Sequence, residues 1–248
     1  MMTAQPAELS AGEIGLFLDV DGTLLDLAPR PEAVVVMPEL LADLRAAERS
    51  LGGALALVSG RPIAQLDYLF APLRLAAGGV HGAEIRRRPE GPVVTLTDGH
   101  LGEEAWQALS RLLGEFPGSY AENKGVSFAV HYPEPGTNIP CLKLALLALM
   151  KQIAVSGNGL KLIAGHAVFE VQLRGFDKGR AIRRFMKQKP FLGRRPVFIG
   201  DDEIDRAGFD AALARGGLAF SVGIDMPGLT GKFADPDAVR SWLHELGK

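Results

Sequence analysis

Apolar residues follow two alternating patterns along the chain. Short apolar runs such as residues 14–20, which contain one acid near the end, are typical of strands buried on both faces of a sheet. Between them lie segments whose apolar residues recur every three or four positions, as Leu40, Leu44 and Ala47 do, which predicts a helix with one buried face. Strands are predicted at 14–20, 54–58, 196–200 and 218–222, with a glycine-interrupted strand and turn at 75–85, and helices at 38–51, 62–70, 178–187, 204–215 and 236–246.

This alternation of strands and helices predicts an α/β fold with a doubly wound, Rossmann-like parallel sheet. Residues 89–172 break the alternation, because two helical segments there are combined with strands at hairpin-like spacing. We therefore expect an α/β core of residues 1–88 and 173–248 with an α+β cap domain inserted at 89–172. The short basic run at residues 86–88 is expected to be a solvated loop.

Composition narrows the class of protein. The 248 residues are 47% hydrophobic and 23% charged, which excludes disorder, collagen and coiled coil as overall descriptions. Lys and Arg number 27 against 29 Asp and Glu, so a nucleic-acid-binding domain, which should be basic, is not expected.

The single cysteine, Cys141, favours a reducing, cytoplasmic setting. The N-terminal segment lacks the basic and apolar regions of a secretory signal, and the most apolar window, residues 142–150, is too short to span a bilayer. We expect a cytoplasmic monomer that binds neither nucleic acid nor membrane.

Polar residues follow the predicted core strands, at the sheet edge where α/β proteins bind ligands. Asp19 and Asp21 stand at the end of the first strand, and two carboxylates there are costly unless a cation holds them. The alternative is an ordinary strand-ending turn, since Asp and Gly favour turns.

Two further strand ends carry groups suited to a phosphate. Ser59, Gly60 and Arg61 precede a helix, where a hydroxyl and backbone N–H groups can hold phosphoryl oxygens, although Ser59 could be a simple helix cap. Lys178 stands at a helix start, against the helix dipole, which is better explained if it faces an anion than if it is exposed.

The last strand end is strongly acidic. Asp201, Asp202, Glu203 and Asp205 follow the apolar strand at 196–200 and would repel one another without a divalent cation. Hard oxygen ligands of this kind suit Mg²⁺, which we take as the expected cofactor.

The four strand ends, taken in chain order, resemble the four motifs of the haloacid dehalogenase superfamily of phosphohydrolases. The motifs read Asp-x-Asp-Gly-Thr-Leu, Ser-Gly-Arg, Lys-Gly and Gly-Asp-Asp-x-x-Asp. The resemblance implies a core strand order of 5-4-1-2-3. It also implies that Asp19 is the nucleophile that forms an aspartyl-phosphate, and that Asp21 is the general acid and base. Ser59 and Lys178 would hold the phosphoryl oxygens, with Gly60 and Arg61 beside them.

The same resemblance implies a metal site made by Asp19, the backbone carbonyl of Asp21, and the acidic pair Asp201 and Asp202. Which member of that pair touches the metal directly stays open, and we favour Asp201. The other acid and Asp205 would support the site from farther away or through water.

Shorter motifs narrow the substrate. Four of them resemble motifs of the trehalose-6-phosphate phosphatase family. They are Gly79-Val80-His81-Gly82, Glu122-x-Lys124-x-x-Ser127, His131-Tyr132, and Glu170 eight residues before Lys178. The resemblance implies hydrolysis of a phosphorylated disaccharide, trehalose 6-phosphate. Glu122, Lys124 and Glu170 would then hold the distal glucose, since carboxylates and ammonium groups hydrogen-bond sugar hydroxyls.

Several alternatives accompany this interpretation. The three cap residues could be an ordinary surface ion pair, and His81 could either line the site or brace its turn. Pro133 stands where family members often have Arg, which affects the substrate assignment more than the reaction. The substrate could be another phosphosugar, such as a sucrose, mannosyl or hexose phosphate, and a non-catalytic phosphosugar-binding module is the alternative from another class.

Overall fold

The computed structural model describes residues 12–27, 34–96, 101–133, 136–153, 159–165 and 167–248. The chain divides into two compact units, one made of Met1–Leu96 and Asp177–Lys248 and the other of Thr97–Phe176. The N-terminal segment, for which no secretory signal is predicted, lies outside the described residues as far as residue 11. No helix within the described ranges is long and apolar enough to cross a membrane.

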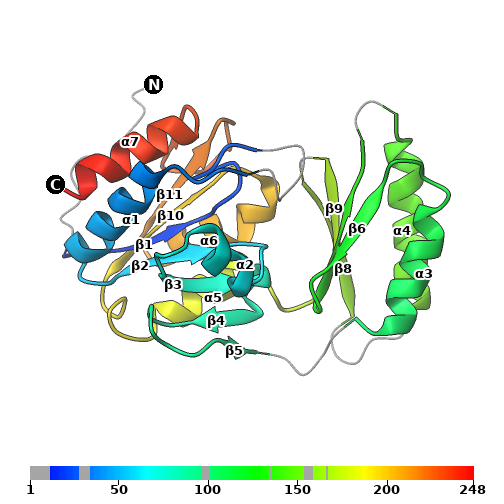
Figure 1. Cartoon of the computed structure of the whole chain (residues 1–248), viewed down its shortest axis with the longest axis horizontal. Coiled ribbons are helices and arrows are strands. Elements are labelled where there is room, and N and C mark those ends of the chain that lie inside the picture. The colour runs from blue at the N-terminus through cyan, green and yellow to red at the C-terminus, as the bar shows by residue number, and fades with distance from the viewer. Residues whose placement is uncertain (1–11, 28–33, 97–100, 134–135, 154–158, 166) are drawn as a thin grey trace. The chain divides into compact units, whose positions relative to one another are not determined.

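The first unit is built on an eight-stranded sheet (Figure 1). Five parallel strands form its centre in the order β11-β10-β1-β2-β3, which is the order that the resemblance implied. A sixth parallel strand, β12, extends one edge, and the antiparallel β4 and β5 extend the other. The strands are β1 (Ile14–Leu18), β2 (Leu55–Val58), β3 (Ala76–Gly79), β4 (Glu84–Arg86), β5 (Val94–Thr95), β10 (Arg195–Gly200), β11 (Leu218–Val222) and β12 (Gly231–Phe233).

Helices connect these strands, as the doubly wound pattern predicts. Helix α1 packs against α7, and α5 packs against α6, while α2 lies near β3 and β4. Two 3₁₀ turns, η2 (Val80–Gly82) and η3 (Glu203–Asp205), follow β3 and precede α6. The helices are α1 (Pro38–Ser50), α2 (Ile63–Leu69), α5 (Lys178–Phe185), α6 (Arg206–Leu213) and α7 (Pro236–Leu246).

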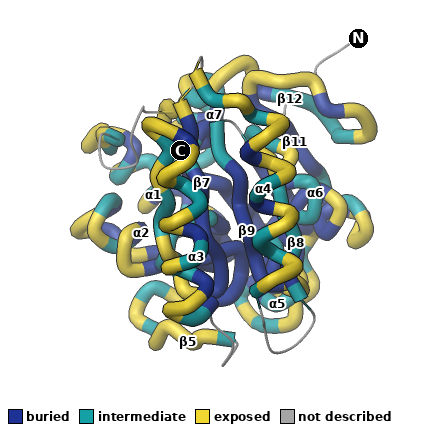
Figure 2. Tube along the Cα trace, turned by 90° about the vertical axis from the view of Figure 1, so that its right-hand side faces the viewer, coloured by how far each residue is buried: buried dark blue, intermediate teal, exposed yellow. Residues whose placement is uncertain are grey.

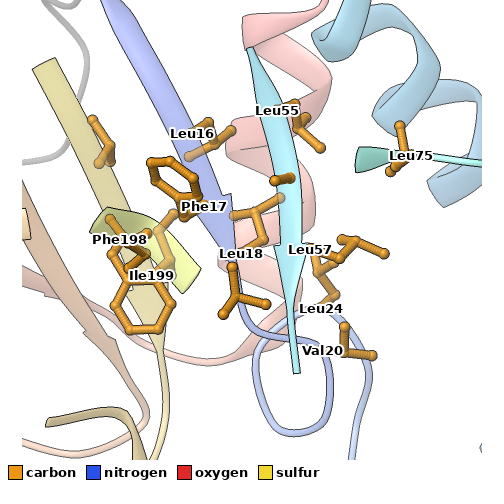
Figure 3. Packing of buried hydrophobic residues seen from close by; sticks show 14 of the residues in the cluster. Leu16, Phe17, Leu18, Val20, Leu24, Leu55, Leu57, Leu75, Phe198 and Ile199 are labelled. Carbon is orange, nitrogen blue, oxygen red and sulfur yellow. The ribbon is translucent and has the colours of Figure 1, made fainter. Parts of the chain in front are cut away.

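The core of this unit explains the short apolar runs. Every residue of β1 is buried, so side chains on both faces of the strand are removed from water. Phe17 lies beside Phe198 of β10 in the sheet register (Figure 3). It also stacks on Phe191, with ring centroids 5.0 Å apart. Each fully buried side chain of this size contributes roughly 1.5–3 kcal/mol, which holds β1 in the middle of the sheet.

The second unit is an antiparallel sheet in the order β6-β7-β9-β8. Apolar residues of one sheet face pack under two helices: Phe128 contacts Trp106 with ring centroids 5.3 Å apart, and Leu142 and Leu146 are buried. Figure 2 shows β7 and β9 buried behind α3 and α4, whose outer positions are exposed. The elements are α3 (Glu103–Leu113), β6 (Tyr120–Asn123), β7 (Ser127–His131), α4 (Ile139–Gln152), β8 (Leu160–Gly165) and β9 (Val168–Leu173).

The prediction that residues 86–88 form a solvated loop is wrong for Arg86. This residue lies on β4 with 1% of its surface exposed, and its guanidinium pairs with Asp67 at 2.6 Å. It also donates two hydrogen bonds to the carbonyl of Leu75, at 3.0 and 2.8 Å. A buried arginine is tolerated because its charge and its fork of donors are both satisfied.

Candidate active site

The turn after β1 positions the first two carboxylates. Asp19 follows the last residue of the strand and is almost fully buried, and its N–H donates to the carbonyl of Ile199 at 2.9 Å. The chain then reverses at Gly22, whose φ of +77° is readily adopted only by glycine. A Cβ at Gly22 would lie 2.1 Å from Oδ2 of Asp201, so the turn and this carboxylate are in direct contact.

Lys178 joins two of the acids. It lies at the start of α5, buried, with its Nζ 2.5 Å from Oδ1 of Asp19 and 2.5 Å from Oδ1 of Asp205. Asp177 caps the helix by accepting a hydrogen bond from the N–H of Arg180 at 2.6 Å, which offsets the cost of a lysine in the first turn. Burial alone would lower the pKa of Lys178, but the charges of Asp19 and Asp205 outweigh it, and this pKa is raised above its usual value.

Negative charge exceeds positive charge at this point. Burial raises the pKa of Asp19 well above its usual value; the ammonium of Lys178 opposes the rise, and the carboxylates of Asp205 and Asp201 add to it. Burial, followed by the charge of Asp205, raises the pKa of Asp201 to about 6. A further cation would relieve this repulsion and keep the carboxylates ionised.

Three carboxylates lie close enough together to hold such a cation. One oxygen each from Asp19, Asp201 and Asp205 lies within 4.8 Å of the others. Oδ2 of Asp205 accepts hydrogen bonds from the N–H groups of Asp201 at 3.0 Å and Asp202 at 3.3 Å, which orients the acidic loop. Oδ1 of Asp202 accepts from the N–H of Glu203 at 2.5 Å and thus caps the 3₁₀ turn. The cluster therefore contains Asp201 rather than Asp202, and its all-carboxylate oxygen set suits Mg²⁺.

Ser59, Gly60 and Arg61 follow β2 and lie near the first carboxylates. The buried Ser59 is not the cap of α2; its Oγ accepts a hydrogen bond from the N–H of Arg61 at 3.1 Å. The guanidinium of Arg61 forms a two-point ion pair with Asp21, from Nε to Oδ2 at 2.7 Å and from Nη2 to Oδ1 at 2.6 Å. Arg61 was predicted to bind substrate and Asp21 to move protons, but their direct pairing was not predicted.

His81 braces this loop. Its ring packs against Gly60, where an added Cβ would lie 2.8 Å from two ring atoms. The N–H of His81 donates to the carbonyl of Ser59, and that of Val80 donates to the carbonyl of Arg61, both at 3.0 Å. Val80 and His81 both have positive φ, 46° and 53°, a strained conformation that persists only where surrounding contacts hold it.

Thr23 is a further polar group that sequence reasoning did not identify. Its hydroxyl is buried, 3.5 Å from Oδ2 of Asp19 and 3.4 Å from Oδ1 of Asp201. It follows the turn glycine within the first motif, and that position was the only available signal in the sequence.

The three predicted sugar-binding residues lie together in the second unit. Glu122 and Glu170 flank Ala129 in the sheet register, and therefore share one sheet face. Nζ of Lys124 is 3.7 Å from Oε2 of Glu170, of which 3% is exposed. Oε1 of Glu122 is 2.8 Å from Nε2 of His131, so this sheet face carries a second polar pair.

Comparisons with known proteins agree with the fold and the motifs. The chain is 38% identical to trehalose-6-phosphate phosphatase of Escherichia coli, over 96% of this chain and 88% of the relative. It is also 38% identical to a probable trehalose-phosphate phosphatase of Sinorhizobium fredii, over 93% and 86%.

Solved structures support the same fold. The C-terminal domain of trehalose-6-phosphate phosphatase from C. albicans superposes with a TM-score of 0.79 at 20% identity, covering 95% of this chain and 93% of that one. A phosphatase of the haloalkanoate dehalogenase superfamily from Bacteroides thetaiotaomicron superposes with a TM-score of 0.62 at 17% identity, covering 98% of each chain. The predicted fold class, a dehalogenase-type α/β core with an α+β insert, is confirmed. The family model described as trehalose-phosphatase matches residues 17–228, and the chain belongs to the trehalose-phosphatase family.

Proposed function

We propose that this protein hydrolyses trehalose 6-phosphate to trehalose and phosphate through an aspartyl-phosphate on Asp19. The observation that carries the proposal is the buried Asp19 carboxylate, held by Lys178 and set beside Asp201 and Asp205. The substrate is the one named for relatives that are 38% identical over nearly the whole chain.

In the first half of the reaction, a carboxylate oxygen of Asp19 attacks phosphorus while the bond from phosphorus to the sugar oxygen breaks. Asp21 donates a proton to that leaving oxygen, which releases trehalose. Lys178 and Ser59 bind the phosphoryl oxygens and offset their charge as the transfer proceeds. Gly60, beside them, has no side chain, which lets the ring of His81 pack against the loop.

In the second half, Asp21 takes a proton from water, and the water oxygen attacks phosphorus. The bond between phosphorus and Asp19 breaks, which releases phosphate and regenerates the carboxylate. Both carboxylate oxygens of Asp21 accept hydrogen bonds from Arg61, at 2.7 and 2.6 Å, so these proton transfers require the two-point ion pair to open and free one oxygen. Arg61 released from this pair can bind the phosphoryl oxygens, which is the substrate-binding role expected for it.

Asp19, Asp201 and the backbone carbonyl of Asp21 would hold Mg²⁺, with Asp202 and Asp205 positioning the acidic loop. When bound, this ion supplies positive charge that neutralises the carboxylates and the phosphoryl group. Of these ligands, the carboxylates of Asp19 and Asp201 offer oxygens within 4.8 Å of each other, close enough to share one cation.

The second unit acts as the substrate-specificity cap. Glu122 and Glu170 accept hydrogen bonds from sugar hydroxyls, and Lys124 donates them. These roles are supported by the polar face of the four-stranded sheet, where the three residues lie close together and Glu170 is nearly buried. We further propose that the protein works as a monomer in the cytoplasm, where its exposed single Cys141 remains a thiol.

Phosphate release by the purified protein tests the proposal. The substrates are trehalose 6-phosphate, sucrose 6-phosphate, glucose 6-phosphate and mannose phosphates, each with Mg²⁺ and with EDTA. A Mg²⁺-dependent preference for trehalose 6-phosphate is expected. Preference for another sugar would refute the substrate, and hydrolysis that survives Asp19→Asn would refute the aspartyl-phosphate.

A further inference from the structure

The polar face of the second unit's sheet extends beyond the charged trio. Residues 168, 170 and 172 of β9 alternate onto the same face, so Gln172 points to the side that carries Glu170. In the register Gln172 lies between Ser127 of β7 and Lys161 of β8. Cross-strand neighbours of this kind have Cβ atoms about 5 Å apart, and the next residue along the face is about 7 Å away.

Gln172 and Ser127 are completely buried, yet their side chains have no partner. Both residues are 0% exposed. Among the described residues, no hydrogen bond reaches Nε2 or Oε1 of Gln172, or Oγ of Ser127. The neighbouring Lys161 is directed elsewhere, because its Nζ donates to the carbonyl of Phe176 at 2.8 Å.

The absence of hydrogen-bond partners for these buried side-chain atoms of Gln172 and Ser127 needs an explanation. A buried amide or hydroxyl without a hydrogen bond destabilises the fold, and most buried polar groups in native proteins are therefore satisfied. The opposite face of the same strand, with Phe169, Val171 and Leu173, is apolar and packed. The sequence of β9 thus separates an apolar face from a polar one, and the polar face keeps unused donors and acceptors.

Their chemistry matches neutral hydroxyl groups. The amide of Gln172 offers an acceptor and two donors side by side, and the hydroxyl of Ser127 can do both. Glutamates only accept and a lysine only donates, so the charged trio lacks groups of this type. A sugar with neighbouring hydroxyls, each both donor and acceptor, can pair with an amide at two points.

We propose that Gln172 and Ser127 are sugar-binding residues, which hydrogen-bond hydroxyls of the substrate beside Glu170 and Lys124. This assignment rests on the proposed function, since it needs a phosphorylated sugar as the substrate. It adds a neutral pair to the charged residues and places it where β7 and β9 pair.

Steady-state kinetics on two substrates test the assignment. Gln172→Leu removes the amide at similar size, and it should raise KM for trehalose 6-phosphate about tenfold, equivalent to about 1.4 kcal/mol. The value of kcat/KM for p-nitrophenyl phosphate, which has no sugar, should stay within about twofold. The matched control is Gln107→Leu, an exposed glutamine on α3, which should change neither.

Thermal unfolding of the same variants identifies a purely structural role. If Gln172→Leu raises Tm by removing an unsatisfied amide and leaves KM for trehalose 6-phosphate unchanged, the assignment is overturned. Equal losses on both substrates overturn it as well. Should Gln172→Leu fail to fold, Ser127→Ala removes only one oxygen atom, and an unchanged KM in that variant has the same consequence.

The wild-type protein distinguishes the two proposals. Wild type that does not prefer trehalose 6-phosphate refutes the proposed function. Wild type that prefers it, together with variants that bind it equally well, refutes only the roles of Gln172 and Ser127.

Discussion

Replacement of Gly22 by alanine tests how the turn after β1 positions the acidic cluster. The added Cβ would lie 2.1 Å from Oδ2 and 2.5 Å from Cγ of Asp201, whereas ordinary contacts begin at 3.4 Å. The Asp201 carboxylate, or the turn itself, must therefore move by about 1 Å. A displacement of about 1 Å at a reacting centre costs about 10²-fold in rate, so kcat should fall by about that factor.

Backbone strain has to be separated from this clash. Alanine in a left-handed conformation costs about 1–2 kcal/mol, and Gly22 has a φ of +77°. Gly193 provides the control, because its φ is +82° and a Cβ there meets nothing within 4 Å. Both variants should lose about 1–2 kcal/mol of unfolding free energy, but only Gly22→Ala should lose turnover.

The assay is hydrolysis of p-nitrophenyl phosphate over a range of Mg²⁺ concentrations, with urea unfolding of each variant in parallel. Gly22→Ala should also need more Mg²⁺ for half-maximal rate, because Asp201 is displaced from the cluster. If its kcat lies within about threefold of the value for Gly193→Ala, the argument from the contact with Asp201 is refuted.

Three further predictions concern polar groups that are buried or pair with a buried group. Lys178→Met leaves two buried carboxylates without their cation and should destabilise the fold by about 3–5 kcal/mol in urea unfolding; a loss below about 1 kcal/mol would contradict this. His81→Ala opens space beside Gly60 and should lower kcat/KM about tenfold or more for both trehalose 6-phosphate and p-nitrophenyl phosphate, whereas a loss confined to the sugar substrate would contradict a bracing role. Burial raises the pKa of Asp67, but the hydrogen bond and charge of Arg86 outweigh it, so this pKa is lowered in the folded state. The stabilisation of the fold by ionised Asp67 is complete above the unfolded-state pKa of about 3.9, and it is lost as the pH falls through the lowered folded-state pKa. Asp67→Asn should therefore lower the free energy of unfolding by about 2 kcal/mol at pH 7, and by progressively less below pH about 4. A pH-independent difference would contradict the ion pair.

The core strands were predictable because burial on both faces leaves a continuous apolar run. The run at 14–20 predicted β1, and the runs at 54–58 and 218–222 predicted β2 and β11 within one residue at their ends. The edge strands β5, β6 and β12 were not predicted. They have two to four residues and are partly polar, and they become strands only by pairing with a neighbour.

The error at Arg86 has the same origin. A run of three arginines is most simply interpreted as exposed, because charged side chains are rarely buried without a partner. The partners here are Asp67 on α2 and the carbonyl of Leu75, which lie 19 and 11 residues away. Their proximity depends on how β4 pairs with β3 and on where α2 packs, and a local pattern contains neither.

By itself, the sequence determined which residues stand at the ends of the core strands, because the apolar runs end at Asp19, Ser59 and Asp201 and parallel strands bring their carboxyl ends to one edge. Only the tertiary structure decided which of these groups touch. The fork of Arg61 on Asp21 joins residues 40 apart, and the bond from Lys178 to Asp19 joins residues 159 apart. Such contacts depend on strand register, turn shape and side-chain rotamers, which the order of amino acids determines only through the packing of the whole fold.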